Sequence, residues 1–191
     1  MKVAIDAGHG WGNRGQGFDP GAVSGEEREA EIVLLYAFVL QRALHAHDIP
    51  TFLTRTNQLM STPLTTRASR ARHARCTHFV SFHCNSAEVS TAQGCEVFYR
   101  TPQSKELAEA LVFPIAHALG VRARGVVQRD GLSVLKFGDR DLTKKAVLIE
   151  LGFLSHAGDR KKLLDRARRE LVCETIASVL AKEQPVRGGT Q

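Results

Sequence analysis

Short apolar runs alternate along this chain with longer segments of helical periodicity, and this alternation limits the folds that the chain can adopt. Strands separated by helices form βαβ units, which assemble into a largely parallel sheet with helices on both faces. We therefore expect an α/β domain built on a twisted sheet of about six strands. The expected strands are 2–6, 50–55, 78–83, 94–100 and 146–151, and the expected helices are 26–46, 64–75, 104–119 and 159–182.

Several boundaries in this pattern rest on local signals. The first helix is expected to begin at Glu26, because Ser24 and Glu27 have the spacing of a capping box. The glycine-rich segment 8–25 before it is typical of a long loop, and residues 120–145 cannot be assigned. The last helix can be continuous or broken into two. With no linker in the chain, residues 1–184 are expected to form one domain and residues 185–191 a flexible C-terminal tail.

The composition is that of a globular domain and excludes several other classes of protein. Hydrophobic residues make up 43% and charged residues 24% of the chain, which is too apolar for wholesale disorder. No apolar run approaches the roughly 18 residues of a membrane span, so we expect no stable membrane insertion. The start, Met1 to Asp6, has only three apolar residues between a lysine and an acid, unlike an export signal. The chain is therefore expected to stay in the cytoplasm where it is made.

The charge balance points to an anionic partner. Lys and Arg number 26 against 20 Asp and Glu, for a net charge of +6. Such a balance is compatible with nucleic acid, a phospholipid surface or an anionic polymer. The basic residues gather in 67–75 and 160–169, and neither cluster is interleaved with aromatic residues, so stacking on single-stranded nucleic acid is unsupported. Alternatively, the two basic clusters are solvent-exposed helix surfaces that bind no partner.

Polar side chains end three of the expected strands, where an apolar side chain would be more favourable. His9 lies just past the first strand, His83 ends the third, and Glu150 follows the most apolar run. Burying an unpaired carboxylate costs on the order of several kcal/mol. Ligands of open α/β sheets bind outside the carboxyl ends of the strands, where these three side chains are expected to meet. Each alone also has a structural interpretation: a loop histidine, a core histidine, or a carboxylate in an ion pair.

A further carboxylate lies on the apolar face of the first expected helix. Glu29 shares this face with Ile32 and Tyr36, as a partner of the helix dipole or as a ligand. Glu31 fits almost as well beside Leu34, and periodicity does not choose between them. Two histidines and one glutamate form a known catalytic zinc shell, and a second carboxylate can take a proton from water there. The spacing contains no compact His-Glu-x-x-His motif, so the zinc site stays one alternative.

A series of motifs, in order along the chain, resembles those of one enzyme family. The chain carries Asp6-Ala7-Gly8-His9-Gly10, Asp19-Pro20-Gly21-Ala22, Glu29 before an apolar stretch, Leu64-x-x-Arg67, Ser81-Phe82-His83-Cys84-Asn85, Gly94-Cys95-Glu96-Val97-Phe98-Tyr99 and Val147-Leu148-Ile149-Glu150-Leu151-Gly152-Phe153-Leu154-Ser155. This series resembles the zinc-dependent N-acetylmuramoyl-L-alanine amidases of the Amidase_3 type. Ala7 stands where those enzymes have proline, which should relax the turn without removing a ligand.

The resemblance implies a reaction and a site. The reaction is hydrolysis of the amide bond between N-acetylmuramic acid and L-alanine of the peptidoglycan stem peptide. The resemblance implies Zn²⁺ as cofactor, with His9, Glu29 and His83 as its ligands and Glu150 as the general base, and it selects Glu29 over Glu31. Arg67 is expected to form a structural ion pair rather than to bind substrate. The candidates for contacts with the ligands or the substrate are Asp6, Asp19, Arg67 and Asn85.

Two other functions remain as alternatives. A zinc peptidase or deacetylase on the same frame would use the same ligands but cut another bond, and a basic nucleic-acid-binding domain would leave the histidines structural. The resemblance favours peptidoglycan as partner, with the basic charge attracting an anionic envelope surface and no role for nucleic acid. Single-domain enzymes of this kind resemble phage or prophage endolysins, and an autolysin released on lysis of the mother cell is the alternative. We therefore expect a monomer held in the cytoplasm, the host cytoplasm if phage-encoded, until its release to the cell wall or periplasm.

Overall fold

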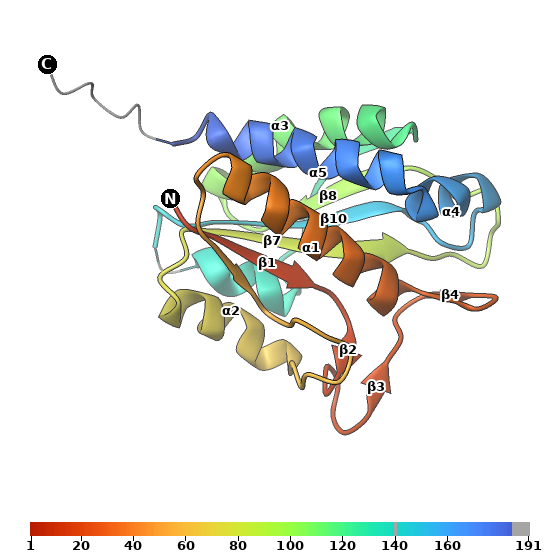
Figure 1. The fold of residues 1–191 in the computed structure, drawn as a ribbon, viewed down its shortest axis with the longest axis horizontal. Coiled ribbons are helices and arrows are strands. Elements are labelled where there is room, and N and C mark those ends of the chain that lie inside the picture. The colour runs from red at the N-terminus through yellow and green to blue at the C-terminus, as the bar shows by residue number, and fades with distance from the viewer. Residues whose placement is uncertain (140, 185–191) are drawn as a thin grey trace, which may run out of the picture.

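Six strands form one sheet through the centre of the molecule in the computed structural model of this chain (Figure 1). The structure describes residues 1–139 and 141–184, so the tail expected at 185–191 lies outside the described residues. All neighbouring strands are parallel except β10 and β8, which confirms an α/β fold on a largely parallel sheet. The strand order is β6 (Thr51–Leu53), β1 (Val3–Ala7), β7 (His78–Asn85), β10 (Lys145–Phe153), β8 (Cys95–Tyr99) and β9 (Ala123–Gln128).

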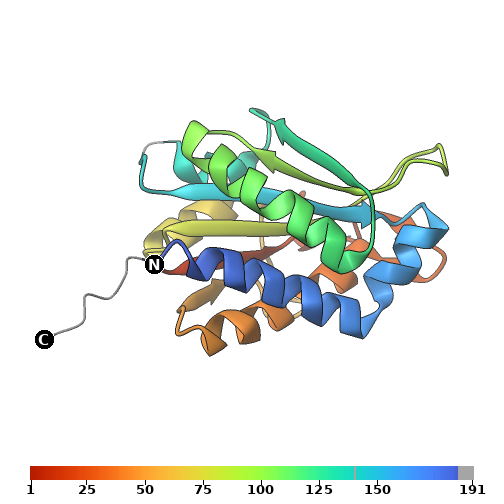
Figure 2. The same cartoon turned by 90° about the horizontal axis from the view of Figure 1, so that it is seen from above.

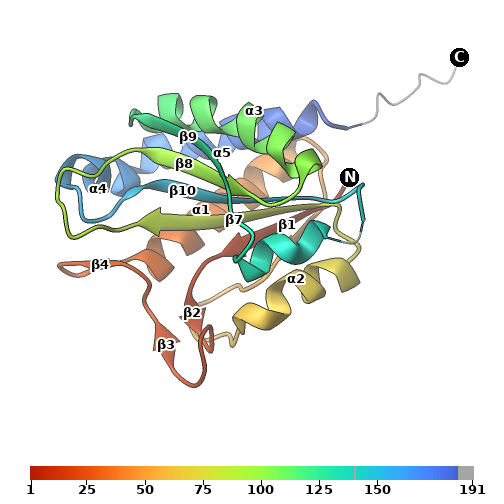
Figure 3. The ribbon, with the colours of Figure 1, turned by 180° about the vertical axis from the view of Figure 1, so that it is seen from behind.

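Helices cover both faces of this sheet, as expected. On one face α1 (Glu29–Ala46), α5 (Arg166–Ala181) and α3 (Pro102–Leu119) lie side by side (Figure 2). The other face carries α2 (Leu64–His73) and the short 3₁₀ helix η1 (Ser133–Gly138), seen in front of the sheet in Figure 3. The helix α4 (Ala157–Leu164) follows β10 and leads into α5. In the described part of the chain, no helix has both the length and the apolar character needed to cross a membrane.

The alternation of side chains along the strands divides the interior into two cores. On β7, Val80 and Phe82 point into the larger core under α1, α3 and α5, whereas Phe79 joins the smaller core beneath α2 and η1. Because alternate residues of a strand face opposite sides, several polar residues of the central strands share the α2 face with Phe79. These residues are Asp6, Ser81, His83, Glu96 and Glu150.

The start of the first helix differs from the expectation. The helix α1 begins at Glu29 rather than Glu26, and its N-cap residue, Arg28, makes no side-chain cap. The capping box is therefore wrong. Residues Glu27–Arg28 form the strand β5, which pairs with β4 (Val23–Ser24) in a small hairpin. The Ser24 hydroxyl accepts a hydrogen bond from Arg160 instead, at 2.7 Å.

The segment predicted as a long loop, 8–25, and the unassigned segment, 120–145, both contain ordered elements. The glycine-rich segment holds a second small hairpin, formed by β2 (Gly10–Trp11) and β3 (Phe18–Asp19). The unassigned segment 120–145 contains the edge strand β9 and the helix η1. The last helical segment is broken in two at Asp165, whose side chain caps α5 by accepting from the amide of Arg168 at 3.0 Å.

The larger core should carry most of the stability of the fold. We expect Phe82→Ala to lower the free energy of unfolding by about 3–5 kcal/mol, because it removes a fully buried ring that packs against Tyr36. Phe113→Ala on α3 is the matched control: Phe113 is 66% exposed, and its loss should change stability by no more than about 0.5 kcal/mol. Urea unfolding of both variants measures the difference, and equal losses would contradict the role of Phe82 in the larger core.

Candidate metal centre

Three side chains from three different elements meet at the carboxyl edge of the central strands. His9 follows β1, Glu29 is the first residue of α1, and His83 lies on β7. Their ligand atoms all lie within 4.8 Å of one another. Glu29 Oε1 is 3.0 Å from His9 Nε2 and 2.9 Å from His83 Nδ1, and the two ring nitrogens are 3.2 Å apart. The structure thus brings together the three residues that the sequence proposed as ligands.

The spacing of these atoms suits a tetrahedral metal ion. A Zn²⁺ with bonds of about 2.0–2.1 Å keeps its ligand atoms about 3.3 Å apart, close to the distances within this cluster. Glu29 is held in its ionised form, which a ligand requires. Burial alone would raise the pKa of Glu29, but the rings of His83 and His9 hold it well below its usual value of 4.5. The backbone amides of Cys84 and Ala22 also donate to its two oxygens, at 2.9 and 2.8 Å.

Asp19 holds the ring of His9 in the orientation that a ligand needs. Its Oδ2 lies 3.0 Å from His9 Nδ1, which directs Nε2 of the ring toward the cluster. Asp19 is itself fixed by the side chain of Asn13 at 2.6 Å and the amide of Gly21 at 2.9 Å. His9 has a φ of 58°, a left-handed conformation that is uncommon for a residue with a side chain. The ring is therefore positioned from both its backbone and its side chain.

Two glycines allow the ligands to approach the backbone closely. A Cβ atom at Gly8 would overlap the ring of His83. At Gly21 it would overlap the Glu29 carboxylate and lie 2.7 Å from Cδ2 of His9, and the φ of +68° also disfavours a side chain there. Both glycines of the opening motifs are thus required by the site geometry.

Glu150 shares a cavity with the three ligands. It pairs in register with His83 on one neighbouring strand and with Glu96 on the other. Its Oε2 is buried and has no hydrogen-bond partner among the described residues. Burial, together with the charges of Glu29 and Glu96, raises the pKa of Glu150 well above its usual value of 4.5. The cavity measures about 320 Å³, and its lining includes His9, Glu29, His83, Asn85 and Glu150.

Glu96 is a residue of this site that the search for candidate residues missed. Its two oxygens accept hydrogen bonds from Asn85 Nδ2 at 2.8 Å and from Arg124 Nε at 3.1 Å. Asn85 therefore lies beside the cavity as a partner of Glu96. The available signal was an acid at a buried position of an otherwise apolar strand, the same signal that identified Glu150.

A buried ion pair lies beneath the ligands. Arg67 donates to Asp6 Oδ1 at 2.8 Å and to the carbonyl of His9 at 2.6 Å, and both side chains are 1% exposed. The hydroxyls of Thr54 and Ser81 donate to the same carboxylate at 2.6 and 2.7 Å. Asp6 therefore binds Arg67 and the two hydroxyls, and Asp19 is the carboxylate that contacts a ligand ring. Arg67 forms a structural pair and also fixes the backbone of His9.

Arg55 was also missed by the sequence analysis. It is fully buried, and its guanidinium donates to the carbonyls of Ala7 and Gly8, both at 2.9 Å. It also donates to the carbonyl of Ala30 at 2.6 Å, next to Glu29. Arg55 thus ties the loop that carries His9 to the first turn of α1. No local pattern distinguishes such an arginine from an exposed one at the end of a strand.

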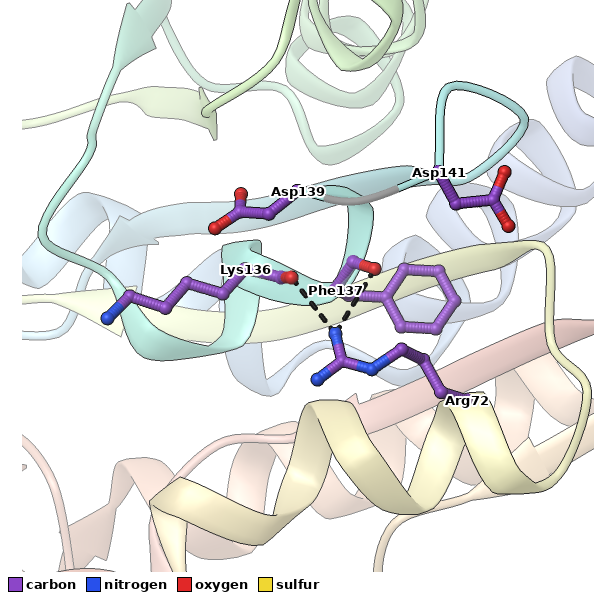
Figure 4. A pocket seen from close by; sticks show the side chains of 5 residues that line it. All are labelled: Arg72, Lys136, Phe137, Asp139 and Asp141. Carbon is purple, nitrogen blue, oxygen red and sulfur yellow. Dashed lines mark hydrogen bonds between the residues drawn. The ribbon is translucent and has the colours of Figure 1, made fainter.

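A separate hollow of about 350 Å³ lies between α2 and η1 and contains none of the ligands (Figure 4). Arg72 donates to the carbonyls of Lys136 at 3.0 Å and Phe137 at 3.3 Å. The two carboxylates of the hollow pair with Arg100 and Lys144. The guanidinium and the carboxylates of this hollow thus already bind other groups of the chain, and the contacts of Arg72 hold α2 against η1.

The fold and the site define an α/β protein with a His-Glu-His centre at the carboxyl edge of its sheet. The sequence model of the Amidase_3 family, N-acetylmuramoyl-L-alanine amidase, matches residues 3–182. The chain therefore belongs to this family, as the motifs had indicated.

Relatives of known sequence and structure agree with this assignment. LytC, an N-acetylmuramoyl-L-alanine amidase of Bacillus subtilis, is 30% identical over 178 residues, which cover 91% of this chain but 34% of LytC. LytH of Staphylococcus aureus, a probable cell wall amidase, is 28% identical over 93% of this chain and 56% of its own. The chain thus spans about a third of the length of LytC and about half of the length of LytH.

Two solved structures cover nearly the whole chain. The catalytic domain of CwlV, an amidase from Bacillus (Paenibacillus) polymyxa, superposes with a TM-score of 0.82 at 31% identity, over 95% of this chain and 97% of its own. An N-acetylmuramoyl-L-alanine amidase from Clostridium difficile 630 gives a TM-score of 0.83 at 29% identity, over 95% of each chain.

The buried pair of Asp6 and Arg67 should make the free energy of unfolding depend on pH. Burial alone would raise the pKa of Asp6, but Arg67, Thr54 and Ser81 hold it below its usual 3.8. A group with a lower pKa in the folded state stabilises the fold above its unfolded pKa and loses that contribution as the pH falls through the folded value. At pH 7 we expect Asp6→Asn to cost about 3–5 kcal/mol, because Arg67 is left buried without its counter-ion.

This stability gap between wild type and Asp6→Asn should stay constant near neutral pH and shrink below about pH 4. Urea unfolding at a series of pH values measures it. Asp48→Asn is the control: Asp48 is exposed, its φ of 56° suits asparagine equally well, and its replacement should leave stability unchanged. A gap that persists undiminished at pH 3 would contradict the role of the Asp6 charge.

Proposed function

We propose that this chain hydrolyses the amide bond between N-acetylmuramic acid and the L-alanine of the peptidoglycan stem peptide, with Zn²⁺ as cofactor. The observation that carries the proposal is the mutual approach of His9, Glu29 and His83 to between 2.9 and 3.2 Å in a member of the amidase family. The names of LytC and CwlV support the amidase reaction, since both are called N-acetylmuramoyl-L-alanine amidases.

Two imidazoles and one carboxylate are a zinc ligand set that leaves a fourth position open for chemistry. A Zn²⁺ bound there would polarise the scissile carbonyl and lower the pKa of a water molecule toward about 7. Within this chain, Asp19 holds the ring of His9 and the amides of Ala22 and Cys84 hold Glu29. These contacts fix the ligands before a substrate arrives.

Glu150 is the general base and then the general acid of the proposed reaction. Its unpartnered Oε2 belongs to the same cavity as the ligands, so it can accept a proton from the attacking water. The same carboxyl group then delivers that proton to the departing amine of L-alanine. Burial of Glu150 favours its protonated form, which supports the second of these two steps.

The charge of the chain supports a proposal about the surface that it approaches. A net charge of +6 supports attraction to an anionic envelope, which salt would weaken. A zinc peptidase or deacetylase could use the same ligands, but membership of the amidase family favours the amide bond to L-alanine. The ligand cluster gives no support to nucleic-acid binding. The single domain 1–184, the monomer, the lysis role and the cytoplasmic location before release stay predictions.

Metal analysis tests the ligand set. We expect one zinc ion per wild-type chain, and loss of that ion in His83→Ala, because the variant removes one of three protein ligands. Glu150→Gln should retain the zinc. The measurement is metal content after dialysis, with circular dichroism to show that each variant is folded. Loss of zinc from Glu150→Gln would mean that Glu150 is a ligand and that the assigned roles are wrong.

Product analysis tests the reaction. Digestion of peptidoglycan should release peptides with new L-alanine amino termini and leave the glycan strands intact. Glu150→Gln should lower turnover by roughly 10²–10⁴-fold, as expected for the loss of a general base. Amino-terminal labelling followed by mass spectrometry identifies the new ends. New D-alanine termini or released acetate would instead indicate a peptidase or a deacetylase.

A further inference from the structure

Two further hollows adjoin the cavity of the candidate centre. The chain leaves β9, crosses the sheet face and enters η1 (Figure 3). Leu132 on this crossing segment lines the central cavity and both hollows. The segment therefore separates two arms, each of which shares lining residues with the central cavity.

The two arms differ in the site residues that line them. The smaller arm measures about 220 Å³ and is lined by His9 and His83 but not by Glu150. The larger arm measures about 620 Å³ and is lined by Glu150 but by none of the three ligands. The other polar residues that line this larger arm, which we name the Glu150 groove, are Asn85, Glu96, Gln128, Arg129 and Asp130.

The proposed reaction gives the two arms different occupants. Glu150 delivers a proton to the departing amine, so that amine must lie within hydrogen-bond reach of Glu150. The peptide attached to the amine then continues into the Glu150 groove. The acyl group being attacked stays over the ligands, on the side of the smaller arm. This assignment of the peptide to one arm rests on the proposed function.

Arg129 is a cation of the Glu150 groove that the chain itself leaves available. Its guanidinium lies over the ring of Phe98, 5.1 Å from the centroid, and it forms no ion pair within residues 1–139 and 141–184. By contrast, both oxygens of Glu96 are engaged by Asn85 and Arg124. A carboxylate entering the groove would therefore find Arg129 free and Glu96 already paired. The other acid of the groove, Asp130, accepts a hydrogen bond from Gln128 at 3.4 Å.

The register of the strands sets the distance between Glu150 and this cation. Glu96 pairs with Glu150, and Phe98, which supports Arg129, pairs with Leu148. Two residues of a strand span about 6.6 Å, and an extended peptide advances about 3.3–3.6 Å per residue. A peptide whose amino group lies beside Glu150 therefore brings the α-carboxyl group of its second residue, almost two residue lengths away, to the level of Arg129.

We propose that the Glu150 groove binds the stem peptide and that Arg129 binds a free carboxylate on its second residue. The planar guanidinium can donate two parallel hydrogen bonds to a carboxylate, and a carboxamide can accept fewer and carries no charge. The preferred substrate class is therefore a muramyl peptide with a free carboxylate, rather than a carboxamide, at the second position of the peptide.

The test compares two muramyl peptides that differ only in whether the second peptide residue carries an α-carboxylate or an α-carboxamide. We expect wild-type chain to cleave the carboxylate peptide with a kcat/KM about 3- to 10-fold higher, the range for a charge pair in an open groove. Arg129→Gln should bring this ratio close to 1, mainly through KM, and Arg129→Lys should retain part of it. Arg122→Gln is the matched control, since Arg122 is exposed but outside the groove.

Three results of this comparison would overturn the carboxylate subsite. A ratio unchanged in Arg129→Gln, or a wild-type ratio of 1, overturns the carboxylate subsite while leaving the amidase reaction intact. An equal loss of preference in Arg122→Gln also overturns it, because the preference would then reflect overall charge. Failure of the wild-type chain to cleave either peptide when loaded with zinc would contradict the proposed function and the subsite together.

Discussion

The buried contact between Asp6 and Arg67 is the interaction on which the rest of the site depends. It joins β1 to α2. The hydroxyl of Ser81 extends it to the neighbouring strand β7, and that of Thr54 extends it to the residue just after β6. Arg55 adds a second buried guanidinium, and burial together with Arg67 lowers its pKa to about 10, so it stays charged at neutral pH. Two cations thus lie near one carboxylate. Most of their other hydrogen bonds go to backbone carbonyls, one goes to the side chain of Gln58, and Arg67 Nε has no partner among the described residues.

These carbonyls belong to the loop that presents His9. Arg55 binds the carbonyls of Ala7 and Gly8, and Arg67 binds those of Ala7 and His9. Because three successive carbonyls are drawn inward, the loop is held in a conformation that places His9 at a φ of 58°. Such a conformation costs on the order of 1 kcal/mol or more, and charge-assisted hydrogen bonds of this kind offset it. The hydrogen bonds from buried Arg55 and Arg67 to the loop carbonyls therefore set the position of the ligand His9.

The sequence predicted the parts of the fold and site that leave a local signal. The runs ending in His83 and Glu150 are largely apolar up to a polar residue that is costly to bury, so both the strands and the candidate residues were visible. The start of α1 could not be predicted in this way, because the hairpin before it depends on a distant partner: Arg160 donates a hydrogen bond to Ser24. Arg55 was missed for the same reason, since its role exists only through carbonyls far from it along the chain.

The openness of the site follows from how the chain connects its strands. The crossovers through α1 and α3 lie on the larger core, and among the described residues α2 and η1 are the helices on the other face. The strand β8 runs antiparallel to β10, and the loop 86–94, rather than a helix, leads to it from β7. Within residues 1–139 and 141–184, no crossover helix therefore covers the face beside Glu150 and Glu96. A single reversed strand thus leaves open the groove along which a peptide substrate would extend from Glu150.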